Sequence, residues 1–387
     1  MNKVAITPCA DYEYENVKKA VEEAISAVDG FDKLKKGSKV AIKANLVASA
    51  KPETATTTHP SVLGAITELC IERGAEVVIG DSPGGLYNAS FVERVYKNCG
   101  LSFCVEKGAK LNDDYSEKTV YNEEAKVCKT FTYTAYLDGA DFIINACKLK
   151  THGMMGLSCA AKNIFGAIPG TMKPEYHFRY PSYEAFADMI IDLDEHFKPD
   201  LCVCDAIVGM EGNGPTAGTP RQIGCIIASK SPYSLDMAAS EIIGLSPSEV
   251  PTVWAAIARG ISPENIEEIK VIGDIEKFRI SDYENIAVKR SLLFKGNSKN
   301  VIKNIFGTVA KRALNSKPVL KSKLCVGCNV CGKICPAKAI EIVNGKAVIN
   351  RAECIRCFCC QEFCPKGAMK VKRTLIARLL EGGRKKR

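Results

Sequence analysis

Two short segments in the last quarter of the chain repeat the cysteine spacing C-x2-C-x2-C-x3-C-P. The first runs from Cys325 to Pro336, and the second follows 29 residues later, from Cys354 to Pro365. Three thiolates in one tight loop can hold three corners of a cubane, and the fourth cysteine, followed by a proline, is carried away to the other cluster. The spacing therefore predicts two [4Fe–4S] clusters that exchange one ligand between the two segments.

This crossed arrangement assigns eight of the nine cysteines in the module. The predicted ligands are Cys325, Cys328, Cys331 and Cys364 for the first cluster, and Cys354, Cys357, Cys360 and Cys335 for the second. Zinc is the alternative, but zinc sites usually separate two C-x2-C pairs by about a dozen residues or more. The ninth thiol, Cys359, is either a bystander or an alternative ligand, and we favour the bystander.

The module resembles the bacterial two-cluster ferredoxin family over residues 320–372, and all eight cysteine ligands match. The resemblance implies a small, pseudo-symmetric α+β fold and one-electron transfer. It also implies a redox partner protein. The repeat continues past the cysteines, since Ala339-Ile340 aligns with Ala368-Met369.

Charge argues against nucleic acid as a partner. The formal net charge of the 387 residues is +9, but residues 366–387 hold nine Lys or Arg and one Glu, which leaves only +1 for the rest (9 − 8). A nucleic-acid-binding body usually has a basic face of its own. The basic tail, residues 373–387, is instead expected to contact an acidic redox partner or an anionic surface, or to be a solvated terminus.

The remaining ten cysteines are scattered between Cys9 and Cys225. The chain shows no run of about 18 apolar residues, so we expect no transmembrane segment. Its start becomes acidic too early for an export signal, which predicts a cytoplasmic location and free thiols. Cys202 and Cys204 lie two apart on a predicted strand, where packing explains them, and Cys147 and Cys159 show no ligand spacing. We therefore expect no metal in this part of the chain.

The first 290 or so residues alternate between helical and strand patterns. Helices are predicted at 16–28, 60–73, 182–196 and 234–260, and strands at 40–42, 76–79, 142–144, 201–204 and 223–228. Residues 118–137 alternate like an antiparallel excursion. Strands that alternate with helices predict an α/β fold with a mainly parallel sheet and flanking helices. The expected layout is an α/β domain (1–295), a basic linker (296–319), the ferredoxin-like domain (320–372) and the tail.

Polar residues follow several of these strands, where the carboxyl ends of parallel strands form a ligand-binding edge. The set predicts a pocket for a small carboxylate- or phosphate-bearing molecule, with Asp81, Asp205 or Asp188 as possible bases or metal ligands. The catalytic candidates are Lys150, His152, Lys162 and His177. The candidates for substrate binding are Lys43, Asn45, His59, Asp81, Ser82, Lys148, Asn163, Lys173, Asp205 and Glu211. Taken singly, each of these lysines and aspartates is also typical of solvated surfaces and turns.

Six segments of this large region resemble the family known only as domain of unknown function 362, which often precedes ferredoxin modules. The segments are Val40–Leu46, Thr58–Pro60, Gly80–Ser82, Lys148–Gly153, Ala161–Gly166 and Gly209–Pro215. The resemblance covers residues 1 to about 290 and implies little about activity, because the family has no agreed one.

Three functions are consistent with these features. The first is an iron–sulfur oxidoreductase, in which the clusters exchange electrons with a substrate in the large domain. The second is a non-enzymatic electron carrier whose large domain docks or senses a partner, and the third is a factor that delivers clusters or metal. Electron transfer is common to the first two, and the substrate, if there is one, is not identified by the sequence.

Overall fold

The computed structural model describes residues 2–286, 288 and 316–372. The chain divides into two compact units, Met1–Val288 and Lys289–Arg387. We call these the N-terminal and C-terminal units and describe each by itself. The predicted basic tail, residues 373–387, and most of the predicted linker, residues 296–315, lie outside the described residues.

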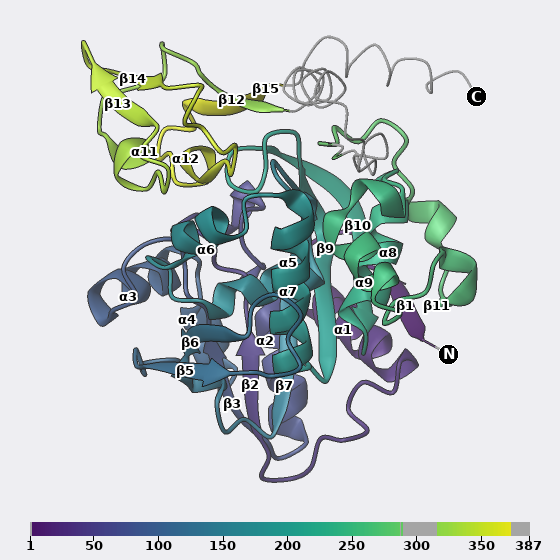
Figure 1. The fold of residues 1–387 in the computed structure, drawn as a ribbon. Coiled ribbons are helices and arrows are strands. Elements are labelled where there is room, and N and C mark those ends of the chain that lie inside the picture. Colours follow the sequence, from purple (N-terminus) through teal and green to yellow (C-terminus); the bar gives the residue numbers. More distant parts are fainter. Residues whose placement is uncertain (1, 287, 289–315, 373–387) are drawn as a thin grey trace. The chain divides into compact units, whose positions relative to one another are not determined.

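One mixed sheet forms the centre of the N-terminal unit (Figure 1). The strands of this unit are β1 (Lys3–Pro8), β2 (Lys39–Lys43), β3 (Glu76–Gly80), β4 (Lys110–Leu111), β5 (Glu117–Tyr121), β6 (Thr130–Thr134), β7 (Phe142–His152), β8 (Gly156–Ser158), β9 (Leu201–Glu211), β10 (Thr219–Ser229) and β11 (Lys270–Ile272). Among the described residues, nine strands join in the order β11-β1-β10-β9-β7-β2-β3-β4, with β8 paired to β7. The run from β9 to β4 is parallel, whereas β10 pairs antiparallel with both β1 and β9.

Helices cover both faces of this sheet. They are α1 (Tyr14–Ala27), α2 (Pro60–Glu72), α3 (Ala89–Asn98), α4 (Ser102–Glu106), α5 (Ala160–Asn163), α6 (Lys173–Arg179), α7 (Tyr183–Phe197), α8 (Pro232–Ile242) and α9 (Pro251–Ala258). Short 3₁₀ turns lie at Pro52–Thr54, Ala135–Leu137, Ile164–Ala167, Pro247–Glu249, Ile266–Glu268 and Ile275–Phe278. The predicted fold class, an α/β sheet with flanking helices, is confirmed.

The sheet has an apolar core on each of its two faces. Helices α1 and α2 bury residues such as Val21 and Leu63 against Ile42, Ile144 and Val203 of the sheet. On the opposite face, a second core contains residues of α8 and α9 together with Cys147, Leu149, Cys202 and Cys204. In Figure 1, α5, α7, α8 and α9 lie in front of the sheet and α1 and α2 behind it. Because side chains alternate along a strand, consecutive residues of β7 and β9 face different cores.

Four predicted elements differ from the structure in length. The strand expected at 223–228 is β10, which runs from Thr219 to Ser229. The strands expected at 142–144 and 201–204 extend to His152 and Glu211, because both stay buried or nearly so along their whole length. The helix expected over 234–260 is two helices, α8 and α9. Gly244 has a left-handed φ of 69°, and Pro247 and Pro251 remove backbone N–H donors, so one helix cannot continue through them. The antiparallel excursion is present as β5 paired with β6.

In its described residues, 316–372, the C-terminal unit has two short antiparallel ladders and two single-turn helices. β12 (Lys317–Leu320) pairs with β15 (Met369–Lys372), and β13 (Ile340–Val343) pairs with β14 (Lys346–Ile349). The helices are α11 (Val330–Lys333) and α12 (Cys359–Glu362). Residues 317–319, which the sequence analysis placed in the linker, thus belong to a ladder of this unit.

The backbone of the C-terminal unit repeats its conformation at an interval of 29 residues. Left-handed φ angles occur at Gly327 and Arg356 (69° and 61°), at Asn329 and Phe358 (59° and 63°), and at Lys338 and Gly367 (50° and 54°). Asn329 and Phe358 each precede one of the two helices. The cysteine loops of the two halves therefore share a local fold as well as a spacing.

Within the described ranges, every helix is too short or too polar to cross a lipid bilayer. The expected cytoplasmic location stays a prediction.

Candidate functional site

A buried ion pair lies where β2 and β3 end. Lys43 is fully buried, and its Nζ lies 2.6 Å from Oδ1 of Asp81. The Asp81 carboxylate also accepts the backbone N–H groups of Leu46 (2.6 Å) and Ser82 (2.8 Å). Burial lowers the pKa of Lys43, and the adjacent Asp81 opposes that shift. The buried positive charge of Lys43 is thus neutralised by the carboxylate of Asp81.

Gly166 covers this ion pair at close range. A Cβ built on Gly166 would lie 2.3 Å from Nζ of Lys43 and 2.4 Å from Oδ1 of Asp81. Nearby, Lys173 donates to the carbonyl oxygens of Ser82 (2.7 Å) and Ile168 (2.5 Å). The segment that carries Gly166 and Lys173 therefore lies against the loop that carries Asp81.

Side-chain amides connect this region to Lys150. Asn163 donates to Oδ1 of Asn145 (2.8 Å) and to the carbonyl of Lys43 (3.2 Å), and it accepts from Asn45 (2.8 Å). Lys150, which is fully buried, donates to Oδ1 of Asn45 (2.7 Å) and to the carbonyl of Thr56 (2.6 Å). Six of the predicted binding residues, with Lys150, thus form one continuous network, which is buried except at the half-buried Lys173.

A second buried ion pair joins β7 to β9. Nζ of Lys148 lies 2.7 Å from Oδ2 of Asp205, and both residues are buried. Tyr12 donates to Oδ1 of Asp205 (2.9 Å) and accepts from Lys148 (2.8 Å). Burial, followed by the charge of Asp205, raises the pKa of Tyr12, so the phenol stays protonated. Tyr12 is not among the predicted site residues, because it lies in an irregular loop without a recognisable motif.

His59 lies against this second pair. Its ring stacks on Tyr12 with centroids 3.7 Å apart, and its backbone N–H donates to Asp205 (3.0 Å). Nδ1 of His59 caps α2 by accepting the N–H of Ser61 (3.2 Å), which leaves the proton of the neutral ring on Nε2. Burial lowers the pKa of His59 to about 4, so the ring is neutral at pH 7.

The two ion pairs belong to different faces of the sheet. Lys43 is the register partner of Asn145, which lies two residues before Cys147 on β7, so these three share the face of the second core. Lys148 and Asp205 are register partners on the opposite face. The segment Thr58-His59 joins the two sides, since Thr58 bonds to Asn45 (3.0 Å) and His59 to Asp205.

Four predicted residues lie in other surroundings. Lys162 and His177 both lie against the neighbouring rings of Phe165 and Phe186. Nζ of Lys162 lies 4.6 Å from the centroid of Phe165, and His177 stacks on Phe186 with centroids 4.2 Å apart. Nδ1 of His152 accepts the N–H groups of Met154 and Met155. Glu211 instead contacts Arg221 (3.8 Å) and the N–H of Glu284.

Asp188, predicted as a possible base or metal ligand, lies on α7 outside this network and forms ion pairs with two cations. It lies 2.8 Å from Arg259 and 3.2 Å from Lys126. The expectation that the polar residues come after the third and fourth predicted strands is wrong. Asn145, Lys148, Lys150 and Asp205 lie within the strands, because β7 and β9 are longer than the apolar runs that marked them.

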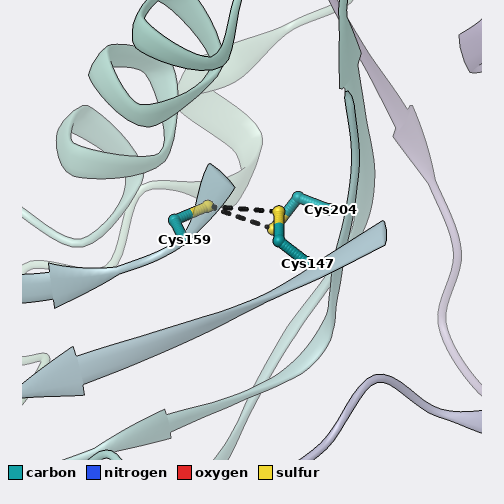
Figure 2. Close-up of side chains that lie close together, drawn as sticks. All are labelled: Cys147, Cys159 and Cys204. Carbon is teal, nitrogen blue, oxygen red and sulfur yellow. Dashed lines mark hydrogen bonds between the residues drawn. The ribbon is translucent and has the colours of Figure 1, made fainter. Parts of the chain in front are cut away.

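Three cysteines for which the sequence predicts no metal site converge in the second core. The Sγ of Cys159 lies 3.7 Å from that of Cys147 and 3.4 Å from that of Cys204, and all three residues are buried (Figure 2). Burial raises the pKa of Cys147 and Cys159, whereas hydrogen bonds from those two thiols outweigh burial and lower the pKa of Cys204 to about 6. No local spacing signals this cluster, because the pairing of β7 with β9 creates it.

In the C-terminal unit the cysteines gather into two sets. All four predicted ligands of the first cluster line one cavity, together with Leu320, Val326 and Met369. Burial and the charges of Cys364 and Cys325 raise the pKa of Cys331. Burial and the charges of Cys357, Cys354, Cys335 and Cys331 raise the pKa of Cys360. Cys364 of the second loop thus lies with the three cysteines of the first loop, and Cys335 of the first loop is close enough to Cys360 to affect its pKa, which fits thiolate-bound iron–sulfur clusters.

Two hydrogen bonds to sulfur repeat between the halves. The N–H of Ala339 donates to Sγ of Cys335 (3.3 Å), and the N–H of Ala368 donates to Sγ of Cys364 (3.2 Å). Cys359 is buried, and a hydrogen bond from its thiol lowers the pKa of Cys357. The ninth thiol is thus a neighbour of the second set.

Comparison with known families and proteins finds two matching regions. Residues 40–241 match the family described as Domain of unknown function (DUF362), and residues 317–365 match a 4Fe-4S dicluster domain. A relative, "Thylakoid-associated protein sll1697" of Synechocystis sp., is 26% identical over 277 residues, which cover 69% of this chain and 82% of the relative.

Two solved structures have low similarity to this chain. The lactate racemase apoprotein from Thermoanaerobacterium thermosaccharolyticum has a TM-score of 0.42 at 11% identity, over 65% of this chain and 58% of that one. A protein from Thermotoga maritima has a TM-score of 0.35 at 13% identity, over 56% and 55% of the two chains. The matching regions of the two families agree with the two resemblances expected from the sequence.

Proposed function

This chain belongs to the family described as Domain of unknown function (DUF362), and we propose that it is an iron–sulfur oxidoreductase. In this proposal the C-terminal unit binds two [4Fe–4S] clusters, and electrons pass to or from a small anionic molecule held in the N-terminal unit. The observation that carries the cluster proposal is that Cys325, Cys328 and Cys331 line one cavity together with Cys364 of the other loop.

The proposed ligation is crossed between the two loops. Cys325, Cys328, Cys331 and Cys364 would hold the first cluster, and Cys354, Cys357, Cys360 and Cys335 the second. When bound, such clusters supply one-electron transfer. The N–H groups of Ala339 and Ala368 donate to the two crossing sulfurs, and hydrogen bonds of this kind are one means by which a protein sets a cluster's potential.

The anion proposal depends on the lysine networks. Lys43 and Lys148 are each paired with an aspartate, and Lys150 adds a third cationic side chain to the same region. Lys162 and Lys173 lie on the neighbouring segment and add positive charge. The cationic side chains of Lys150 and Lys173 would favour a carboxylate or phosphate close to them. Neutral His59 would be a hydrogen-bond donor through Nε2, since Nδ1 is already used as a cap.

Native mass spectrometry of full-length protein, purified without oxygen, tests both parts. Mass for eight irons and eight sulfides, plus a small bound molecule that disappears in K150M, is the expected result. Iron for a single cluster would refute the two-cluster proposal. Two clusters without any anion bound, even after addition of carboxylates and phosphates, would refute the anion proposal alone.

A second function is favoured by one specific observation. Lys43 and Lys148 each already have an aspartate within 2.7 Å, so these two buried lysines are neutralised without a ligand. That arrangement suits an electron carrier whose N-terminal unit docks a redox partner protein. The carrier is favoured if the reduction potentials of the clusters do not change when small anions are added but shift when a partner protein binds.

A further inference from the structure

We propose that Cys147, Cys159 and Cys204 bind a single thiophilic metal ion, Cu(I), in three-coordinate geometry. The site is independent of the proposed iron–sulfur clusters, because its ligands all belong to the N-terminal unit. It also lies on the opposite face of the sheet from the Lys148–Asp205 pair.

The spacing of the three sulfurs suits one shared ion. Metal–thiolate bonds of about 2.3 Å in a plane place the sulfurs about 4 Å apart. The separations of Cys159 from Cys147 and Cys204 are 3.7 Å and 3.4 Å, and all three sulfurs lie within 4.8 Å of one another. A disulfide requires a distance of about 2.05 Å. A cubane would need its thiolates on separate irons at different corners, whereas these sulfurs converge on one point (Figure 2).

The three ligands are held by rigid elements. Cys147 and Cys204 are register partners on the parallel strands β7 and β9, at the centre of the sheet. Cys159 lies between β8 and α5, where the Asp236 carboxylate accepts the N–H groups of the next two residues, Ala160 (2.6 Å) and Ala161 (3.2 Å). Strands and an anchored turn therefore place the sulfurs before any metal arrives, which lowers the cost of binding.

Other buried cysteines of this unit behave differently. Cys99, Cys104 and Cys128 each direct their thiol to a backbone carbonyl, at 3.8, 3.6 and 3.7 Å. Those contacts are typical of small buried residues that fill a core. Cys147, Cys159 and Cys204 instead direct their sulfurs toward one another, which packing alone does not require.

The donor set selects the class of ion. Thiolates are soft ligands that prefer Cu(I) and zinc over magnesium, calcium or manganese. Zinc in structural sites takes four ligands, but the candidate group among the described residues contains three cysteines and no histidine or carboxylate. An ion that is satisfied by three thiolates therefore fits better than zinc.

Binding of Cu(I) here involves no electron transfer. Cu⁺ forms three Cu–S bonds, and each thiol that becomes a thiolate releases one proton to the buffer. Part of the resulting negative charge is offset by nearby cations. The charge of Lys148 acts on Cys204, and Lys43 is close enough to Cys147 for their charges to interact.

The test uses full-length protein with its clusters intact, under anaerobic conditions, titrated with Cu(I) from a competing chelator. We expect one copper per chain, unchanged iron content, and three sulfur neighbours in X-ray absorption at the copper edge. C204S should weaken copper binding by at least about 100-fold, since loss of a direct ligand should cost no less than loss of an outer-shell partner. C202S is the matched control, because Cys202 lies two residues away on the same strand and in the same core.

Several results would overturn the proposal. These are the absence of copper binding, copper that displaces iron, a bound ion with four ligands, or equal copper affinity in C204S and C202S. A disulfide between two of the three cysteines in the anaerobic protein would also do so. If C204S does not fold, as judged by Trp254 fluorescence, the wild-type absorption spectrum still decides, because it counts the sulfur neighbours directly.

Discussion

Removing the charge of Asp81 should destabilise the N-terminal unit strongly. Asp81 is the carboxylate partner of Lys43, which is fully buried, at 2.6 Å. At an effective dielectric constant of 20, charges at that distance interact by about 6 kcal/mol. Asn in place of Asp81 removes this attraction but keeps one oxygen acceptor for the N–H of Leu46 or Ser82. Because an unpaired buried charge remains, we expect D81N to cost about 3–5 kcal/mol.

Urea unfolding under anaerobic conditions, followed by the fluorescence of Trp254, measures this cost. Trp254 is the single tryptophan of the chain and is buried on α9, so its signal reports on the N-terminal unit alone. The matched control is D29N, because Lys3 and Asp29 are also 2.6 Å apart but exposed. Solvent screens such a pair, so D29N should leave the unfolding midpoint unchanged.

A double-mutant cycle with K43M isolates the pair. K43M should also destabilise the unit, but D81N together with K43M should cost about 3 kcal/mol less than the sum of the two changes. Additive effects, or a D81N cost below about 1 kcal/mol, would refute the reasoning that the ion pair is the essential feature.

The pH dependence gives an independent check. Burial lowers the pKa of Lys43 in the folded state, whereas the unfolded value is about 10.4. The folded state therefore binds fewer protons between those two values, and stability rises with pH across that window. Loss of Asp81 lowers the folded pKa further, so the deficit of D81N should shrink from pH 7 to pH 9.

Three further predictions concern single side chains. C364A should remove the cluster of the first loop, leaving about four irons per chain, and paramagnetic resonance of reduced protein should retain only the second cluster's signal; loss from the second loop would contradict the crossed assignment. C359A should keep its iron content but lower the potential of the second cluster in a redox titration, because Cys357 loses a hydrogen-bond donor; an unchanged potential would make Cys359 a bystander. The pKa of His59 is about 4 when folded and about 6.5 when unfolded, so the unfolded state binds more protons between these values. Stability should fall by about 1–2 kcal/mol from pH 7 to pH 5, and H59N, which keeps a helix cap, should lose this dependence in urea titrations at both pH values.

The sequence predicted those features that depend on local spacing. The cysteine loops, the helices α1 and α2, and the parallel strands β2 and β3 all follow from residue patterns within a few turns or pleats. Lys43, Asn45, Asp81 and Asn163 were expected at one edge of the sheet, and the structure brings them together. Each belongs to a segment whose position at a strand end or on a neighbouring loop was visible in the sequence.

Features that depend on strand order could not be predicted in this way. Neither the antiparallel placement of β10 nor the pairing of β7 with β9 has a local signal. The convergence of Cys147, Cys159 and Cys204 follows from that pairing, although the residues lie up to 57 positions apart (204 − 147). The internal pairing of Lys148 with Asp205 also required the tertiary structure, since either charge alone reads as an exposed one.

The two cysteine sets of the C-terminal unit differ in exposure. Cys328 is exposed and lies beside Val326, which is 62% exposed, whereas its counterpart in the repeat, Cys357, is 8% exposed. The next counterparts, Cys331 and Cys360, are both buried, at 8% and 6%. Dissolved oxygen, chelators and scavenging thiols would therefore meet the first set before the second. The two halves, alike in sequence and backbone, would therefore lose their proposed clusters to oxidation or chelation at different rates, the first faster than the second.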